Sequence, residues 1–233
     1  MQKMLNAACH IALVGLIHDI SRLAQNAGAG ETFFDIVVKA VPDGEATPFT
    51  SWHEMGDTGS VWSTLSLGGL KTTYLQQILT AAACVASGRS KMTVNVEEKN
   101  SRNVRLRSIF ESVSLTDQGA VSQKQTCWGM PLTALTPASL FPQDRKKLAA
   151  DGDAYRALWQ AFENGITRTS VQAVPEDFRR NWPLWLDAFD TAWLTFAGAV
   201  PQDAAEGGEP DVSMYDHGKA TAAIATALWG WHE

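Results

Sequence analysis

The sequence predicts a mainly α-helical bundle with a small β-rich insertion around residues 90–140. Three observations lead to this fold class. Apolar residues recur at helical spacing near both ends of the chain, glycines follow several of these stretches, and the middle of the chain first alternates like a strand and then becomes rich in proline. With 233 residues, 45% of them hydrophobic, the chain can build one substantial core, so we expect a single domain over 1–233.

The apolar pattern predicts a series of helices. The first is expected to end at 27–30 and the third at Gly88, because glycine is the commonest residue just beyond a helix C-terminus. The first and last helices are expected to lie side by side. The predicted helices cover residues 4–27, 50–67, 73–87, 144–150, 153–167, 175–199 and 216–231.

The middle of the chain differs from both ends. Residues 92–96 alternate between apolar and polar side chains and predict a strand. Residues 106–115 favour a turn followed by a strand. Residues 116–142 are expected to be irregular because three prolines interrupt them.

Composition excludes several classes of protein. A net charge of −6 gives no global basic field to attract nucleic acid. The three cysteines are odd in number and form no CxxC pair, so we expect no disulfide framework and a cytoplasmic location. No stretch has the roughly 20 apolar residues that a membrane span requires, so no membrane association is expected.

Two histidine–aspartate pairs are the candidate functional residues. His18 and Asp19 lie near the start of the chain, and Asp216 and His217 lie near its end. Imidazole suits transition metals, and carboxylate supplies the negative charge that holds a cation. If the two ends of the chain meet, the pairs would form a divalent-metal site.

Five motifs occur in order along nearly the whole chain. They are GLIHDISRL at 15–23, SRNVRLRSIFESVSL at 101–115, WGMPLTALTPASLFP at 128–142, VPEDFRRNWPLWLDAFDTAWLTFAGAVP at 174–201 and PDVSMYDHGKATAAIATALW at 210–229. Together they resemble the HD domain of the large subunit of type III CRISPR effector complexes, which opens with GLLHDIGKF and closes with PDVSLYDHSKTTAAIAAALY. The resemblance implies an HD-type bundle whose motif order is circularly permuted.

The resemblance implies a function in RNA-guided antiviral defence. The chain would be the N-terminal part of a longer cytoplasmic protein, followed by palm domains that make cyclic oligoadenylate. Its implied partners are that palm part, the other effector subunits and, indirectly, the guide RNA complex. An active domain of this family is a metal-dependent nuclease acting on single-stranded DNA.

Several residues are implied as the metal site and its catalytic groups. His18 and Asp19 would be catalytic, and would bind the metal together with His217, Asp216 and His53. The implied cofactor is a divalent transition metal such as manganese, nickel or cobalt if the site is functional, and none otherwise.

The chain departs from the family pattern at three ligand positions. Gly68 and Gly69 stand where the family has a His-His pair, and Ala83 stands where it has an aspartate. Neither glycine nor alanine can ligate a metal through its side chain. We therefore expect a degenerate domain with a mainly architectural role, and the sequence leaves open whether residual nuclease activity makes it an enzyme.

A basic cluster offers a weaker prediction. Arg102, Arg105 and Arg107 could contact a phosphate backbone, or they could form a solvated edge paired with nearby glutamates. The latter interpretation is favoured.

Two other classes of function stay open. The first is a free-standing metal-dependent HD phosphohydrolase acting on a nucleotide. Such enzymes place a lone histidine before the HD pair and an aspartate late, whereas here an Asp-His pair comes last. The second is a purely binding module.

Overall fold

The fold is known from a computed structural model, which describes seven segments of the chain. These segments are residues 2–29, 72–88, 104–108, 128–148, 152–166, 181–202 and 210–232.

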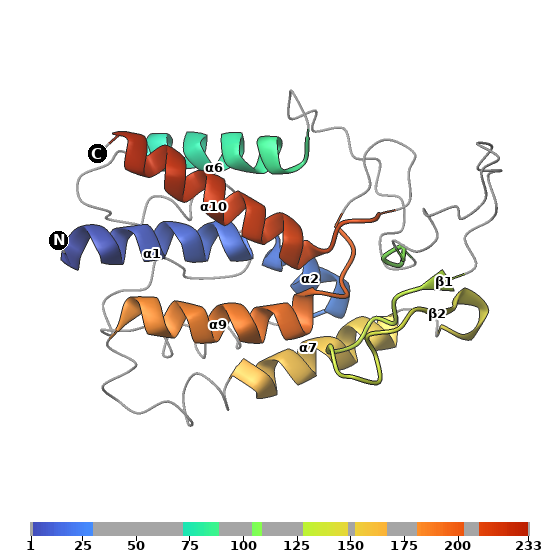
Figure 1. The fold of residues 1–233 in the computed structure, drawn as a ribbon. Helices are drawn as coiled ribbons and strands as arrows, with labels where there is room; N and C mark the ends of the chain where they lie inside the picture. Colours follow the sequence, from blue (N-terminus) through green and yellow to red (C-terminus); the bar gives the residue numbers. More distant parts are fainter. Residues whose placement is uncertain are drawn as a thin grey trace, which may run out of the picture.

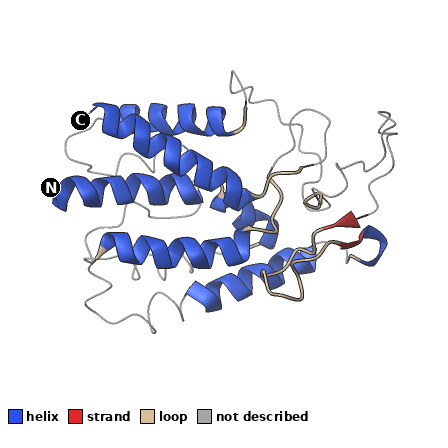
Figure 2. Ribbon diagram, in the orientation of Figure 1, coloured by secondary structure: helices blue, strands red, loops and turns tan. Residues whose placement is uncertain are grey.

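Helices dominate the described segments, as Figures 1 and 2 show. The six α-helices described are α1 (Gln2–Ile17), α2 (Ile20–Ala27), α6 (Thr72–Ala86), α7 (Gly152–Ile166), α9 (Trp182–Ala197) and α10 (Met214–His232). The remaining elements described are the strands β1 (Trp128–Gly129) and β2 (Gln143–Asp144) and the 3-10 helix η4 (Arg145–Lys147).

The first and last helices pack against each other, as the sequence predicts. α10 lies between α6 and α1, and α1 lies between α10 and α9 (Figure 1). Two glycines allow the backbones of α1 and α10 to approach closely. A Cβ at Gly15 would lie 2.6 Å from the Cα of Ala222, and a Cβ at Gly218 would lie 2.3 Å from the carbonyl oxygen of Leu16. This crossing brings the two histidine–aspartate pairs to the same end of the bundle.

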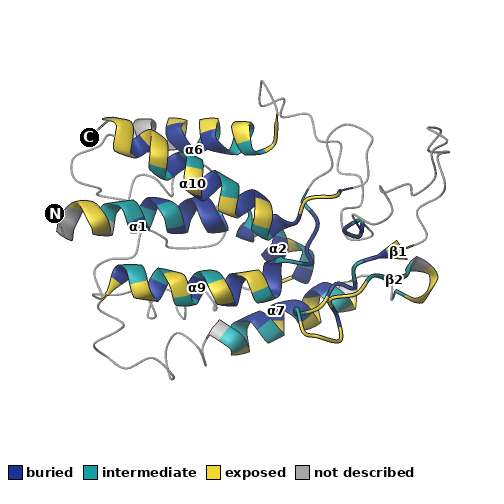
Figure 3. Cartoon of the chain, viewed as in Figure 1, coloured by how far each residue is buried: buried dark blue, intermediate teal, exposed yellow. Residues whose placement is uncertain are grey.

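A second packing centre lies between α7 and α9 and is largely aromatic. Asn181 caps α9 by accepting a hydrogen bond from the backbone N–H of Leu184, and the buried face of the helix then follows helical spacing. Phe162 of α7 packs edge-on against Trp193 and Phe196 of α9. Figure 3 shows that α7 and α9 each carry buried stretches that alternate with exposed ones. This cluster holds α7 and α9 together.

The chain breaks at His18 and Asp19, where the sequence predicts one continuous helix over 4–27. The residues form a turn between α1 and α2, and α2 packs against α7. α2 ends as predicted, because Gly28 adopts a positive φ of 65° and its backbone N–H bonds back into the last turn. The break is what presents both side chains at one place.

The described part of the insertion is a small ribbon. β1 pairs antiparallel with β2, and Arg107 forms an isolated antiparallel bridge with Gly129. The residues between the two strands are turns and bends, in agreement with the irregular structure predicted there. The helix predicted over 144–150 is wrong, because Asp144 ends β2 and only the 3-10 helix η4 follows.

The other predicted helices have different outcomes. Those over 73–87, 153–167 and 216–231 are confirmed within one or two residues, and α9 occupies the predicted range from Trp182 onward. Gly88 follows α6 with a φ of 65°. The helix predicted over 50–67 and the strand predicted over 92–96 lie outside the described residues. Among the described helices, none combines the length and the apolarity needed to cross a bilayer.

Candidate metal centre

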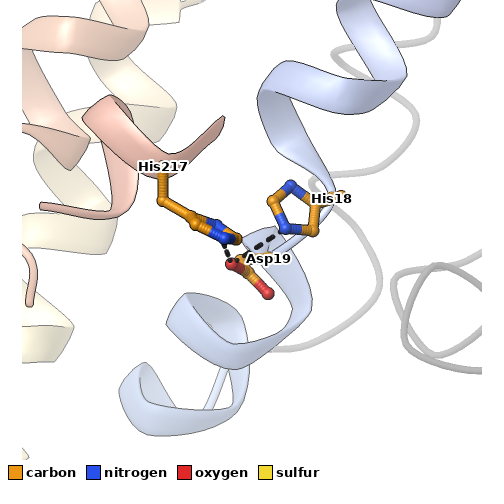
Figure 4. Close-up of side chains that lie close together, drawn as sticks. All are labelled: His18, Asp19 and His217. Atoms are coloured by element: carbon orange, nitrogen blue, oxygen red, sulfur yellow. Dashed lines mark ion pairs between the residues drawn. The ribbon is translucent and has the colours of Figure 1, made fainter. Parts of the chain in front are cut away.

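Three side chains from the two ends of the chain converge at the crossing of α1 and α10. His18 and Asp19 come from the break after α1, and His217 comes from the first turn of α10 (Figure 4). One Asp19 carboxylate oxygen, Oδ2, lies 3.2 Å from Nε2 of His18 and 3.3 Å from Nδ1 of His217. Within the described residues, this is the group of histidine, cysteine and acidic side chains whose ligand atoms could share one metal ion.

Local structure places His217 in the site. Ser213 caps the start of α10, because its Oγ accepts a hydrogen bond from the backbone N–H of Asp216 at 3.0 Å. The segment before the helix is anchored as well, since the backbone N–H of Met214 donates to the carbonyl of Val200. His217 is therefore held at a buried position, with only 4% of its side chain exposed.

The hydrogen bonds of the two imidazoles leave a nitrogen of each facing the carboxylate. Nδ1 of His18 lies 2.8 Å from the carbonyl oxygen of Gly15, which can only accept, so Nδ1 carries a hydrogen and Nε2 faces Asp19. Nδ1 of His217 is buried and has no hydrogen-bond partner, although it lies close to Asp19. A buried imidazole nitrogen without such a partner, beside a carboxylate, is an arrangement that a metal cation would satisfy.

Asp19 is oriented by a chain of hydrogen bonds from two other segments. Nε2 of Gln202 donates to Oδ2 of Asp19 at 2.9 Å, and Arg22 of α2 donates to Oε1 of Gln202 at 2.7 Å. Arg22 also donates to the carbonyl of Pro201. These contacts tie the carboxylate to the segment that precedes α10.

The charges at the site shift the pKa values of both members of the HD pair. Burial is the largest influence, and by itself it lowers the pKa of His18 and raises that of Asp19. For His18, attraction to Asp19 and hydrogen bonds to Asp19 and Gly15 outweigh burial. For Asp19, attraction to His18 and Arg22 and the close contacts of both imidazoles outweigh it. The pKa of His18 therefore lies above its ordinary 6.5, and the pKa of Asp19 is held well below its ordinary 3.8.

The remaining residues predicted for the metal site do not join this group in the described structure. Asp216 is exposed and accepts a hydrogen bond from Ser213 Oγ at 2.7 Å, so it takes part in the helix cap, and its role as a ligand stays a prediction. His53, Gly68 and Gly69 lie outside the described residues.

The predicted basic cluster is placed only in part. Arg102 lies outside the described residues. Arg105 is only 6% exposed, and Arg107 is half-buried in its bridge to β1. These two side chains therefore offer little charge to an external phosphate backbone, but their burial also differs from the solvated edge that was favoured, and the nearby glutamates lie outside the described residues.

Three residues at the site were not predicted to take part in it. Ser87 lies just after α6, and its Oγ is 2.9 Å from Nε2 of His217. Gln202 and Arg22 support Asp19. The sequence signal for Ser87 was present in the Ala-Ser-Gly that ends its helix, but Gln202 has no comparable motif.

A separate groove of about 620 Å³ lies between α1, α9 and α10. Its lining is mostly apolar, with Asp187, Asp190 and Lys219 among it, and it includes none of the three clustered residues. It is therefore distinct from the candidate metal centre.

Comparisons with known proteins support the fold. No protein-family model matches the sequence, and no match is found among curated proteins. The fold is similar to that of a chain in the crystal structure of a Csm1–Csm4 cassette in complex with cA4, with a TM-score of 0.58 and 18% sequence identity. The match covers 96% of this chain and 28% of that chain, so this chain spans less than a third of the length of the chain it matches.

Proposed function

We propose that the chain is the HD-type domain of the large subunit of a type III CRISPR effector complex, with a mainly architectural role and one weak divalent-metal site. The fold shared with a Csm1–Csm4 structure and the five ordered motifs support the first part. The convergence of His18, Asp19 and His217 supports the second.

The single observation that carries the metal site is the buried Nδ1 of His217. It has no hydrogen-bond partner and lies 3.3 Å from the Asp19 carboxylate, with Nε2 of His18 on the other side of that oxygen. Two imidazole nitrogens and one carboxylate form a mixed donor set that suits borderline metals such as cobalt and nickel better than calcium or magnesium, and the carboxylate also allows manganese.

A metal held there would polarise a phosphate oxygen and lower the pKa of a bound water towards neutrality. His18 and His217 would bind it through nitrogen, and Asp19 would supply the negative charge. Gln202 keeps the carboxylate oriented, and Arg22 keeps Gln202 in place.

We attribute weak metal binding and the loss of nuclease activity to the side of the site that is formed by the end of α6. α6 brings Ala83 and Ser87 to this region, and Ala83 has no donor atom in its side chain. Three protein ligands are enough for one metal with open positions. A two-metal centre, which stabilises both the attacking and the leaving oxygens of a phosphodiester, would need further ligands.

The test combines metal binding with a cleavage assay. We expect calorimetry to show one weak Mn²⁺ site in the wild-type chain, lost in His18→Ala and Asp19→Ala, and no cleavage of single-stranded DNA with Mn²⁺. Manganese-dependent cleavage that disappears in both variants would overturn the architectural proposal. Absence of Mn²⁺, Co²⁺ and Ni²⁺ binding would overturn the metal site.

The assignment to an effector complex has its own test. The chain should co-purify with the palm part of the large subunit and with the remaining effector proteins when they are produced together. Failure to co-purify, combined with hydrolysis of a nucleotide, would instead favour the free-standing phosphohydrolase.

A further inference from the structure

Ser87 lies at the junction between α6 and the candidate metal centre. Its Oγ is 2.7 Å from the carbonyl oxygen of Ala83 in the last turn of α6 and 2.9 Å from Nε2 of His217 in α10. One hydroxyl therefore links α6 to a histidine of the metal site.

The donors and acceptors around this hydroxyl can be assigned. A serine hydroxyl carries a single hydrogen and can accept two hydrogen bonds. A carbonyl oxygen can only accept, so the contact with Ala83 uses the serine hydrogen. The contact with His217 must then run the other way, with Nε2–H donating to Ser87 Oγ.

A hydrogen on Nε2 determines what the rest of the His217 ring presents. In neutral imidazole only one nitrogen carries a hydrogen, so Nδ1 keeps a free lone pair. This Nδ1 is the buried nitrogen that lies beside Asp19 without a hydrogen-bond partner. The hydrogen bond to Ser87 thus leaves His217 in the tautomer whose Nδ1 can bind a metal.

With the opposite hydrogen-bond directions, Ser87 would donate to His217 and His217 would donate to Asp19, which is the order of a hydrolase triad. This order requires a hydrogen on Nδ1 donated to Asp19, but although Oδ2 of Asp19 lies 3.3 Å from this nitrogen, the contact does not have the geometry of a hydrogen bond. The backbone N–H groups of Ser87 and Gly88 already donate to the carbonyls of Ala83 and Val85, so neither is free to stabilise an oxyanion. The geometry disfavours this alternative.

We propose that Ser87 is a positioning residue that holds His217 in its Nε2–H tautomer, so that a metal is bound through Nδ1 of His217 and Nε2 of His18. The inference rests on the metal site of the proposed function. Groups that orient a metal-binding histidine in this way change metal affinity by about 10- to 100-fold when removed.

The experiment compares Ser87→Ala, Ser87→Thr and a matched control in the full chain. Thr191→Ala is the control, because the hydroxyl of Thr191, an exposed residue of α9, also donates to a carbonyl one turn earlier, that of Asp187 at 3.1 Å. We expect Ser87→Ala to weaken Mn²⁺ binding by about 10- to 100-fold. Ser87→Thr should stay within a few-fold of wild type, and Thr191→Ala should leave the affinity unchanged.

A second measurement does not depend on metal. Long-range ¹⁵N–¹H NMR of the metal-free protein, with the His217 signals assigned from His217→Gln, should show the Nε2–H tautomer in the wild type. Ser87→Ala should raise the population with hydrogen on Nδ1, whereas Thr191→Ala should not.

The possible results distinguish the role of Ser87 from the existence of the metal site. Metal binding by the wild type with equal affinity in Ser87→Ala overturns the role of Ser87 and leaves the metal site standing. No metal binding by the wild type overturns the metal site, and the NMR result still decides the role of Ser87. An Nδ1–H tautomer in the wild type, or covalent labelling of Ser87 by a fluorophosphonate, overturns this inference in favour of the triad.

Discussion

The two sides of the candidate metal centre offer a cation very different surroundings. The side built by the α1–α2 break and α10 carries two imidazoles and a carboxylate within a few ångströms of one another. The side built by the end of α6 carries Ala83 and the hydroxyl of Ser87, which already serves His217. The comparison teaches that a side with no ligand side chain among its described residues can still support the site, through a hydrogen bond to one of the ligands.

Each side depends on the other in a different way. The ligand-bearing side needs the close approach of α1 and α10, which two glycines permit. The α6 side contributes a hydrogen bond to a ligand and no ligand of its own among its described residues. The predictions below change one side at a time, beginning with the largest expected effect.

The first prediction removes the charge from the ligand-bearing side. Asp19→Asn keeps the size of the side chain, but it takes away the negative charge that both imidazoles face. We expect Mn²⁺ affinity to fall by more than about 100-fold, which exceeds the usual cost of losing a group that only orients a ligand. Calorimetry measures the change, and Asp153→Asn, at an exposed position of α7, is the matched control. Equal affinities in both variants would place the metal elsewhere.

The second prediction separates the two helices that carry the ligands. In Gly218→Ala the new Cβ would meet the Leu16 carbonyl oxygen at 2.3 Å, so the backbones of α1 and α10 must move apart. We expect the free energy of unfolding to fall by about 1–3 kcal/mol, as measured by urea denaturation, and Mn²⁺ binding to weaken.

Gly230→Ala provides the control for this second prediction. A Cβ at Gly230 in α10 would meet no atom within 4 Å. The substitution should stabilise the protein by about 0.5–1 kcal/mol, because alanine loses less backbone entropy than glycine in a helix. If both variants shifted stability in the same direction, the close approach of the helices would not be what holds the ligands together.

The third prediction adds charge to the side that lacks it. Ala83→Asp introduces a carboxylate one turn before Ser87, on the face of α6 nearest His217. Added attraction between this carboxylate and a divalent ion across partly hydrated space should raise Mn²⁺ affinity by about tenfold. Ala81→Asp adds the same charge to the same helix at an exposed position and should change the affinity much less. If Mn²⁺ affinity rose equally in both variants, the gain would come from the net charge of the protein and not from the position of residue 83.

Sequence alone predicted the scaffold of the ligand-bearing side well. Helical periodicity located α1 and α10, and the expectation that the chain ends meet is confirmed. The break at His18 was not predictable from periodicity, because apolar spacing continues through Ile20 without interruption. The helix-capping contact of Asp216 could have been recognised, since Ser213 precedes it by three residues as in a capping box.

The supporting contacts were beyond sequence reasoning for a different reason. Ser87 and His217 are 130 positions apart, and Gln202 and Asp19 are 183 positions apart. Such pairs arise only from how the helices pack, and no local pattern reports them. The α6 side was predicted from the resemblance at Ala83, whereas the paired glycines of that prediction lie outside the described residues.

The last prediction concerns pH, to which the ligand-bearing side should respond and the α6 side should not. The lowered pKa of Asp19 stabilises the fold above its unfolded value of about 3.8, and this stabilisation is lost as pH falls through the folded pKa. The raised pKa of His18 stabilises the fold below its unfolded value of 6.5, and that stabilisation is lost as pH rises through the folded pKa.

The two shifts together define a pH window for the metal-free protein. Its stability from this pair should be greatest between about pH 4 and about pH 6.5, where Asp19 is ionised and His18 is protonated. A metal needs His18 in its neutral form, so Mn²⁺ must displace a proton there. Addition of Mn²⁺ should therefore raise the melting temperature more at about pH 8 than at about pH 6, and binding should release protons. Melting curves at both values, with Asp19→Asn alongside, measure the effect. The variant should lose both the stability window and the pH-dependent gain with Mn²⁺, and a gain independent of pH would show that His18 is not a ligand.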